Sequence, residues 1–281
     1  MKRNWNTTIF TNLLPFLFLA LFLEILFPHK AAFSKSKTYQ FGRQDKIFAF
    51  HFIDEIKGWA VGNRGLVVYT QDGAETWNRI EKVPDVALYD ITFIGQNGWI
   101  VGREGIILHT KDGGKHWEKQ KSPTQASLTS IFFLDQKKGV IAGEGGTVLL
   151  TENGGAEWQL ASLNWEELLP KVLKERGVIS PNLYDLFFLN ESYGWMVGDN
   201  GMVLFSADGG KHWEVLRIGL FPPLFSVFFK DEKEGWVAGQ NGLLLHSKDG
   251  GRSWERMNST TDKSLYRIRM EDGCLLMAGD L

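Results

Sequence analysis

An octapeptide that recurs five times is the feature that most constrains the fold. Its pattern is Ser/Thr-x-Asp-x-Gly-x-x-Trp, with Ala74 replacing the Gly in the first copy and Asn153 replacing the Asp in the third. The closing tryptophans are spaced 40, 41, 55 and 41 residues apart, at Trp77, Trp117, Trp158, Trp213 and Trp254. A period of about 40 residues predicts a series of repeated supersecondary units.

Each repeat contains short apolar runs that are bounded by turn residues. In the second repeat these are LYDITF at Leu88, GWIVG at Gly98 and GIILHT at Gly105, followed by the octapeptide and a polar segment that begins at Trp117. Short runs rich in Val, Ile, Leu and Phe between Gly, Asn and Asp are typical of strands. Four strands per repeat predict an all-β fold, a β-propeller of four-stranded blades.

The spacing predicts five complete repeats and a partial sixth within a propeller that spans 38–281. The blades are expected at 46–86, 87–126, 127–161, 182–222 and 223–262, with the partial blade at 263–281. The last repeat ends after two strands, so we favour a C-terminally truncated fragment. The alternative is a six-bladed ring that closes irregularly, with TYQFGRQ at Thr38 supplying one missing strand.

Residues 1–34 have the order of a secretory signal. Lys2 and Arg3 precede LLPFLFLALFLEILF at Leu13, and a small-residue site, Ala32-Phe33-Ser34, follows. A retained membrane anchor is an equal alternative, because Ile9 to Phe27 is close to the ~20 apolar residues that span a bilayer. Both interpretations predict export, and association with a membrane through this segment is possible only if it is retained.

Composition excludes several classes of function. The net charge of -2 argues against non-specific nucleic-acid binding, which needs clustered positive charge. The single cysteine, Cys274, excludes an internal disulfide framework and a cysteine-based zinc site. The six histidines show no metal-binding spacing and no phosphate-binding Gly-rich loop is present, so we expect no metal and no cofactor.

The carboxylate of the octapeptide is interpreted as part of a turn. Asp in a tight turn accepts hydrogen bonds from backbone N–H groups about two residues further on, and the glycines allow positive φ. Asn153 would keep this acceptor while losing the charge that catalysis or metal binding requires. We therefore assign structural roles, with the Trp packing against a neighbouring blade, to Asp72, Trp77, Asp112, Trp117, Asn153, Trp158, Asp208, Trp213, Asp249 and Trp254.

The octapeptide resembles the Asp-box, or BNR, repeat. The longer string G-W-x-V-G followed by the octapeptide resembles the photosystem II assembly and stability factor family, luminal propellers that also have relatives in non-photosynthetic bacteria. This resemblance implies seven blades, a location in the thylakoid lumen or the periplasm, and a non-enzymatic function in which reaction-centre subunits are held during biogenesis. Two alternatives stay open: an exported propeller with a different client protein, and a glycan-active enzyme such as a sialidase or glycoside hydrolase.

An insertion at about 162–181 separates the third and fourth blades. Asn164, with Glu167 three residues later, predicts the start of a short helix, which Pro170 breaks and Gly177 ends. Strand alternation places this insertion on the face of the turns between second and third strands, where Arg64 and Arg103 are expected at equivalent positions of adjacent blades. The candidate partner-binding residues are Arg64, Arg103, Trp165, Lys171, Lys174 and Arg176. A solvated set of balanced charges is the alternative.

The enzymatic alternative depends on two carboxylates. Glycosidases use a pair of Asp or Glu residues across the scissile bond, and Asp90 and Asp185 lie at the same position of first strands. Ser130, Ser226 and Arg267 occupy that position in other repeats. We therefore interpret all of them as polar residues at strand ends and assign no catalytic residue.

Overall fold

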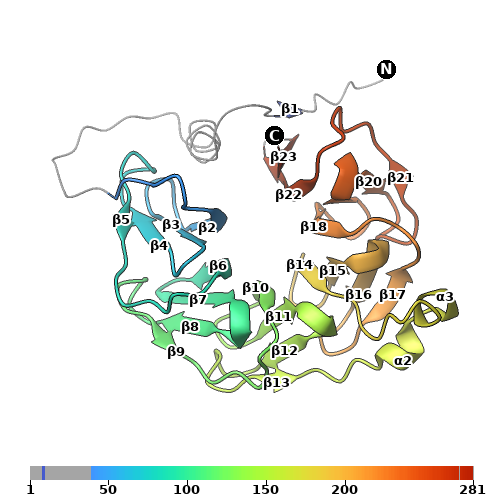
Figure 1. Ribbon diagram of the computed structural model, residues 1–281, viewed down its shortest axis with the longest axis horizontal. Coiled ribbons are helices and arrows are strands. Elements are labelled where there is room, and N and C mark those ends of the chain that lie inside the picture. Colours follow the sequence, from blue (N-terminus) through green and yellow to red (C-terminus); the bar gives the residue numbers. More distant parts are fainter. Residues whose placement is uncertain (1–7, 10–38, 272, 281) are drawn as a thin grey trace.

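The computed structural model describes residues 8–9, 39–271 and 273–280. In this part of the chain the strands form six sheets, arranged as an arc around a common centre (Figure 1). Five sheets contain four antiparallel strands in sequential order, and the sixth contains β22 (Leu265–Glu271), β23 (Cys274–Gly279) and the two-residue β1 (Thr8–Ile9), which pairs parallel with β23. The sheets are the blades of an all-β propeller, as predicted.

Each complete blade contains one long inner strand, two central strands and a short outer strand. Blade 1 consists of β2 (Ile47–Phe52), β3 (Gly58–Gly62), β4 (Val67–Thr70) and β5 (Asn78–Arg79). Blade 2 consists of β6 (Leu88–Ile94), β7 (Asn97–Gly102), β8 (Ile107–Thr110) and β9 (Glu118–Lys119). Blade 3 consists of β10 (Leu128–Phe133), β11 (Gly139–Gly143), β12 (Val148–Thr151) and β13 (Gln159–Leu160). Blade 4 consists of β14 (Leu183–Phe188), β15 (Gly194–Gly198), β16 (Met202–Ser206) and β17 (Glu214–Arg217). Blade 5 consists of β18 (Leu224–Phe229), β19 (Gly235–Gly239), β20 (Leu244–Ser247) and β21 (Glu255–Arg256).

The second strand of each complete blade is its most buried element. All five residues of β3, β11, β15 and β19 are buried. Neighbouring blades cover both faces of β11, β15 and β19, whereas Tyr39 and Phe41 pack against the core on one face of blade 1. The glycine that opens this strand is required by packing. A Cβ at Gly98 would lie 2.4 Å from the ring of Phe93, and a Cβ at Gly235 would lie 2.4 Å from the ring of Phe229.

Aromatic stacks join consecutive blades. Trp195 of β15 stacks on Phe229 of β18 with ring centroids 3.7 Å apart, and Trp254 meets the same Phe229 edge-on at 6.1 Å. The same trio occurs between blades 2 and 3, where Trp99 lies 3.6 Å from Phe133 and Phe133 lies 5.9 Å from Trp158. The octapeptide Trp therefore lies within the core between two blades.

The indole N–H of the second-strand tryptophan also reaches the following blade. Trp99 donates to the carbonyl of Gly154 at 3.1 Å, and Trp195 donates to the carbonyl of Gly250 at 2.9 Å. Both acceptors belong to octapeptide turns. Each turn is thus fixed to the preceding blade by a hydrogen bond as well as by ring packing.

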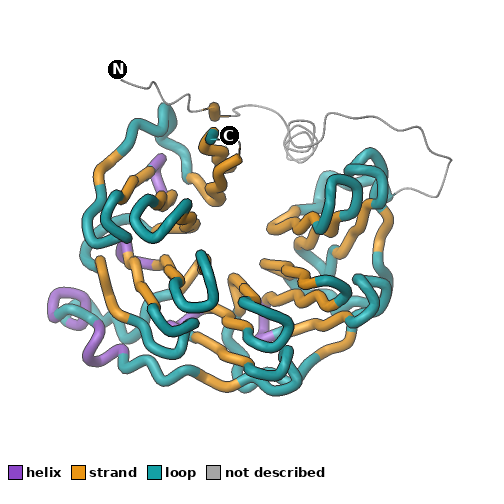
Figure 2. Tube along the Cα trace, turned by 180° about the vertical axis from the view of Figure 1, so that it is seen from behind, coloured by secondary structure: helices purple, strands orange, loops and turns teal. Residues whose placement is uncertain are grey.

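The insertion forms the short, broken helix that was predicted. Its two turns are α2 (Trp165–Leu168) and α3 (Lys171–Lys174), separated at Pro170, and Gly177 ends the segment with a φ of 81°. Leu173 is buried, whereas Val172 beside it is exposed. The Asn164 side chain makes no capping hydrogen bond; its backbone carbonyl accepts from Leu168 instead. Figure 2 shows both turns at the outer rim of the arc.

The described part of the segment TYQFGRQ, residues 39–44, lies against blade 1. Thr38 and the expected signal or anchor at 1–34 lie outside the described residues, apart from β1. The N–H of Tyr39 donates to the carbonyl of Trp77, and Phe41 packs edge-on against the Trp77 ring. Residues 39–44 form no strand, so the hypothesis that they complete the sixth sheet is wrong. Within the described ranges, no helix has the length and apolarity to cross a bilayer.

Replacing Phe229 with Ala should destabilise the fold strongly. The change leaves Trp195 and Trp254 without the ring between them, and truncation of a buried Phe typically costs about 3–5 kcal/mol. Denaturant unfolding would measure the loss. Leu160→Ala, at a side chain that is 56% exposed, is the matched control and should change stability by less than about 0.5 kcal/mol. Equal effects of the two substitutions would contradict the stacking argument.

His51 should make the fold sensitive to mild acid. Burial lowers the pKa of His51 to about 4, from the ordinary value of 6.5. Below pH 6.5 the unfolded chain takes up a proton that the folded chain accepts only near pH 4, so stability falls across this window. We expect a loss of about 2 kcal/mol between pH 7 and pH 5, measured by denaturant unfolding. His51→Phe should flatten this part of the profile, and an unchanged slope would show that other groups cause it.

Candidate functional site

The octapeptide turns are closed by a repeated set of hydrogen bonds. In the second copy the hydroxyl of Thr110 donates to Asp112 at 2.8 Å and accepts from the N–H of Gly114 at 3.0 Å. Asp112 accepts from the N–H of His116 at 3.0 Å, four residues further on and not two as expected. The two intervening glycine positions have positive φ, which widens the turn and moves the donor to the fourth residue.

The third copy shows that this turn does not need a charge. Asn153 accepts from the N–H of Glu157 at 2.9 Å and from the hydroxyl of Thr151 at 3.0 Å, the same positions that Asp satisfies elsewhere. In the second copy, the side-chain hydrogen bond from His116 lowers the pKa of Asp112, so the carboxylate charge is stabilised within the turn itself. Among the described residues, no three His, Cys, Asp or Glu side chains form a group that could hold a metal ion.

The opposite face carries the turns between second and third strands. Hydrogen bonds tie these turns to the loops between blades, for example from the N–H of Arg103 to the carbonyl of Ala87 at 2.8 Å. Both kinds of loop therefore share one face, as predicted. The four later turns are 3-10 helices: η1 (Arg103–Gly105), η2 (Glu144–Gly146), η3 (Asp199–Gly201) and η4 (Gln240–Gly242).

Arg64 and Arg103 are exposed on this face, but they do not occupy equivalent positions. Arg103 directly follows the last glycine of its strand, as Asn63 does in blade 1. Arg64 lies one residue later, with a φ of 55°, where blade 2 has Glu104 with a φ of 59°. The prediction that Arg64 and Arg103 are equivalent was wrong by one residue. The turns align by the residue with positive φ, which is Arg64 in blade 1 and Glu104 in blade 2. Arg64 also donates to the side chain of Gln44 at 3.0 Å.

The remaining candidate residues lie on the insertion. Trp165 is half-buried, and its indole N–H donates to the carbonyl of Gly146 at 3.2 Å, so it anchors the insertion to η2. Lys171 pairs with Glu175 at 3.5 Å. Lys174 contacts Glu166 through both its backbone carbonyl, at 2.9 Å, and its carboxylate, at 3.4 Å.

The structure separates the candidate basic residues into two groups. Arg176 is exposed, and its guanidinium makes no ion pair with another described residue. It lies on the insertion with Lys171 and Lys174, beside β17, whereas Arg64 and Arg103 lie across the arc in blades 1 and 2 (Figure 1). Both lysines are paired with glutamates of the insertion, so the candidate residues without an ion-pair partner among the described residues are Arg64, Arg103 and Arg176.

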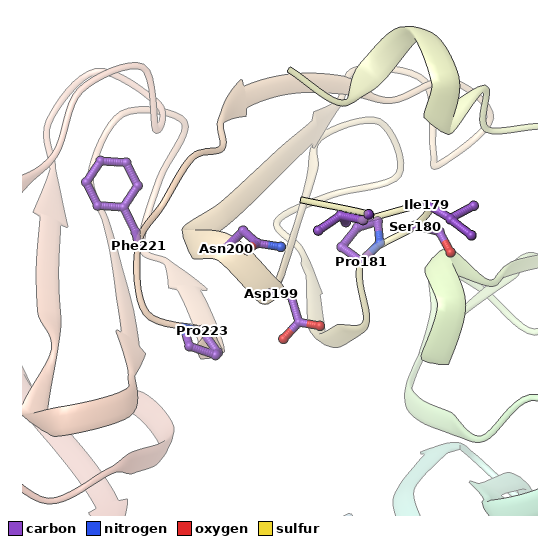
Figure 3. Close-up of a pocket in the computed structure, with 9 residues that line it drawn as sticks. Ile179, Ser180, Pro181, Asp199, Asn200, Phe221 and Pro223 are labelled. Atoms are coloured by element: carbon purple, nitrogen blue, oxygen red, sulfur yellow. The ribbon is translucent and has the colours of Figure 1, made fainter. Parts of the chain in front are cut away.

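A pocket of about 470 Å³ opens between the insertion, η3 and the loop that follows β17. Figure 3 shows Phe221 and Ile179 on opposite sides, with Asn200 and Asp199 between them. None of these residues was predicted to belong to a site. The sequence feature that could have indicated the pocket is GLFPP at Gly219, where large apolar residues stand among Gly and Pro, which favour turns.

Asp90 and Asp185, the carboxylates of the enzymatic alternative, are buried on the inner strands. Asp185 is 1% exposed and accepts from the Ser226 hydroxyl at 2.7 Å, from the N–H of Val227 at 3.1 Å and from the Arg267 guanidinium at 3.0 Å. Each of these donors comes from a later blade. Asp185 therefore links blade 4 to blade 5 and to β22.

Asp90 has the same role between blades 2 and 3. It is 5% exposed, accepts from the N–H of Ile131 at 2.9 Å and from the Ser130 hydroxyl at 3.1 Å, and lies 4.0 Å from Arg267. Burial raises the pKa of Asp90, partly offset by the charge of Arg267. Blade 1 has Ala49 at the equivalent position, and its side chain offers no acceptor. The N–H of Ile91 therefore donates to Asp90 of its own strand, at 2.9 Å. These carboxylates are saturated by the fold, which supports the interpretation as structural residues.

Replacing Asp185 with Ala should destabilise the protein by about 3–5 kcal/mol. The change leaves the Arg267 guanidinium without its closest counter-charge and two buried donors of blade 5 without an acceptor. Thermal or denaturant unfolding measures the effect. Glu157→Ala, at an exposed carboxylate whose side chain faces solvent, should change stability by less than about 0.5 kcal/mol. A stable Asp185→Ala variant would mean that the carboxylate is not part of the framework.

Comparison with known structures shows the same fold at low sequence identity. A structure of YCF48 bound to a D1 peptide is 23% identical and covers 89% of this chain and 95% of that chain, with a TM-score of 0.50. YCF48 from Cyanidioschyzon merolae is 20% identical over 87% of this chain and 94% of that chain, with a TM-score of 0.49. An ancestral GH74 enzyme reaches a TM-score of 0.64 at 12% identity, covering 79% of this chain but 33% of its own. A search of the curated proteins finds no significant match.

The family comparison covers most of the propeller. The model of photosynthesis system II assembly factor YCF48 matches residues 29–126 and 177–263. The interval between the two matches contains blade 3 and the helices α2 and α3. Since the matched segments contain four of the five octapeptides and make up more than half of the chain, the protein belongs to the YCF48 family of photosystem II assembly factors.

Proposed function

We propose that this protein is a non-enzymatic propeller that binds and holds a photosystem II reaction-centre subunit during assembly. The family match carries this proposal. A relative with the same fold has been solved with a D1 peptide, which makes D1 the client to test first. Export to the thylakoid lumen or the periplasm, through the segment at 1–34, forms part of the same proposal.

The saturated interior supports binding over catalysis. Asp90 and Asp185 are buried and fully engaged by donors from neighbouring blades, so neither is placed to transfer a proton to a substrate. The structural likeness to a GH74 enzyme is at 12% identity and concerns the propeller architecture alone.

The face of the second-to-third-strand turns is the proposed binding surface. It carries Arg64 and Arg103 without an ion-pair partner among the described residues, and the insertion extends it with Lys171, Lys174 and Arg176. Exposed arginines attract acidic segments and set the register of an interface through charge complementarity. Trp165 contributes by holding the insertion on η2 and not by direct contact, because its ring is half-buried against Gly146.

Simultaneous replacement of Arg64 and Arg103 with Ala should weaken client binding. Loss of two central charged contacts typically reduces affinity by about tenfold or more. Overlapping labelled peptides of D1, titrated with the full chain and followed by fluorescence anisotropy, would measure the change. Raising the salt concentration should weaken the wild-type complex more than the variant complex, because screening acts on the charges that the variant lacks.

Lys111→Ala with Lys115→Ala is the matched control for this experiment. Both lysines are exposed on the octapeptide turn of blade 2, on the opposite face. This double variant should bind the client peptides like the wild type. Equal binding by the arginine variant and the lysine variant would refute the assignment of the binding face, and absence of binding to every D1 peptide would refute D1 as the client.

A further inference from the structure

The pocket beside the insertion has walls that are fixed before any ligand arrives. One wall is the loop after β17, where the Arg217 guanidinium lies 4.1 Å from the centre of the Phe221 ring. Arg217 also donates to the carbonyl of Gly201 in η3, at 3.4 Å. Phe221 packs closely over this turn, since a Cβ at Gly201 would lie 2.6 Å from the Cβ of Phe221. The aromatic wall is therefore held in place from two sides.

The opposite wall is the segment that leaves the insertion. Asn182 ties it to both adjacent turns: its side chain accepts from the N–H of Gly145 at 3.0 Å, and its N–H donates to Asp199 at 3.0 Å. Val178 donates its N–H to the carbonyl of Leu173 at 3.1 Å. This segment spans the edge between blades 3 and 4, so the pocket is a feature of the insertion and of the blades together.

Large apolar side chains line the pocket but remain exposed to solvent. Ile179 is 85% exposed and Phe221 is 48% exposed, and Leu220 in the same loop is 50% exposed. Contiguous exposed apolar surface around a concave site is typical of a binding site. Its volume, about 470 Å³, lies within the range of sites that enclose small ligands or short peptide segments.

The charge of the pocket indicates what it would bind. Asp199 is the only ionisable residue in the lining, and its two oxygens accept from the Tyr184 hydroxyl at 2.8 Å and from the N–H of Asn182 at 3.0 Å. A carboxylate has about four lone-pair sites, so each oxygen can accept a further donor. Burial and the hydrogen bond to Asp199 raise the pKa of Tyr184 to about 12, and the charge of Glu144 in the neighbouring η2 makes a smaller contribution in the same direction. The first residue of each turn at this edge is therefore acidic, Glu144 in η2 and Asp199 in η3.

We propose that this pocket, the insertion pocket, binds an extended segment of a protein partner in which large apolar residues flank a lysine or arginine. The apolar side chains would pack between Phe221 and Ile179, and the cation would donate to Asp199. This inference rests on the proposed protein-binding function and adds a second, chemically different contact to it.

The two contacts together give the binding face a direction. Around the arc, Arg64 and Arg103 lie in the turns of blades 1 and 2, whereas Glu144 and Asp199 open the turns of blades 3 and 4. Lys171 and Lys174 of the insertion are paired with glutamates of the insertion. A partner segment that crosses the face has acidic residues at the arginine end and basic and apolar residues at the insertion pocket. The reverse orientation places its basic residues beside Arg64 and Arg103 and its acidic residues beside Asp199.

Two fluorescein-labelled peptides of twelve residues test the pocket directly. Both consist of Gly and Ser around a central motif, which is Phe-Lys-Phe in one and Phe-Glu-Phe in the other. We expect the full chain to bind the lysine peptide at least about tenfold more tightly, by fluorescence anisotropy. Ile179→Ser should weaken this binding by about tenfold, because it removes most of one apolar wall. Asp199→Asn should abolish the preference for lysine while keeping an acceptor for Tyr184.

Leu160→Ser is the control, because Leu160 is a similarly exposed apolar residue, 56% exposed, on β13. It should bind both peptides like the wild type. Equal affinities for the two peptides, undetectable binding of both, or an Ile179→Ser variant that binds normally would each overturn the insertion pocket. None of these results affects capture of D1 peptides through Arg64 and Arg103, which is measured separately, so failure of the pocket and failure of the proposed function can be told apart.

Discussion

The stacking of three aromatic rings between blades 1 and 2, blades 2 and 3, and blades 4 and 5 is the interaction on which the rest of the structure depends. A second-strand Trp, the Phe of the next inner strand and the Trp of the next octapeptide pack in sequence, as in Trp195, Phe229 and Trp254. The stack explains why the strand must open with Gly, and the indole N–H of Trp195 explains why the octapeptide turn keeps its shape. Since each aromatic pair adds about 0.5–1.5 kcal/mol beyond burial, repetition makes the ring rigid and leaves its loops free to carry function.

A second set of contacts between blades runs along the inner strands. It engages Asp90 and Asp185, the carboxylates of the enzymatic alternative. Asp90 and Asp185 each accept a hydrogen bond from a backbone N–H of the next blade. An uncharged acceptor can make the same contact, since Ser226 accepts from the N–H of Ile268 at 3.3 Å. Arg267 approaches both carboxylates, at 3.0 Å from Asp185 and 4.0 Å from Asp90. A polar residue stands at this position in blades 2 to 5 and in β22, whereas blade 1 has Ala49 there.

Periodic features could be predicted from the sequence, and single contacts could not. Five octapeptides gave the blades, their strands and the two faces, because backbone pairing and burial repeat with the period. The offset between Arg64 and Arg103 was missed, since only the φ of the turn residues defines their alignment. Asn164 was assigned a capping role that its side chain does not perform. The insertion pocket could not be predicted because Ile179, Asp199 and Phe221 belong to three separate loops that the fold brings together.

The position of the insertion has a physical explanation in the stacks. At the interface between blades 3 and 4 the second-strand Trp is replaced by Val140, and the core there is built from Phe132 and Phe188, 5.6 Å apart. Trp165 of the insertion joins this core from the rim. The ring is therefore joined differently at the one place where an added segment contributes to the packing. The insertion also forms a wall of the insertion pocket, so the proposed pocket lies at the blade interface that Val140 leaves without the stacking Trp.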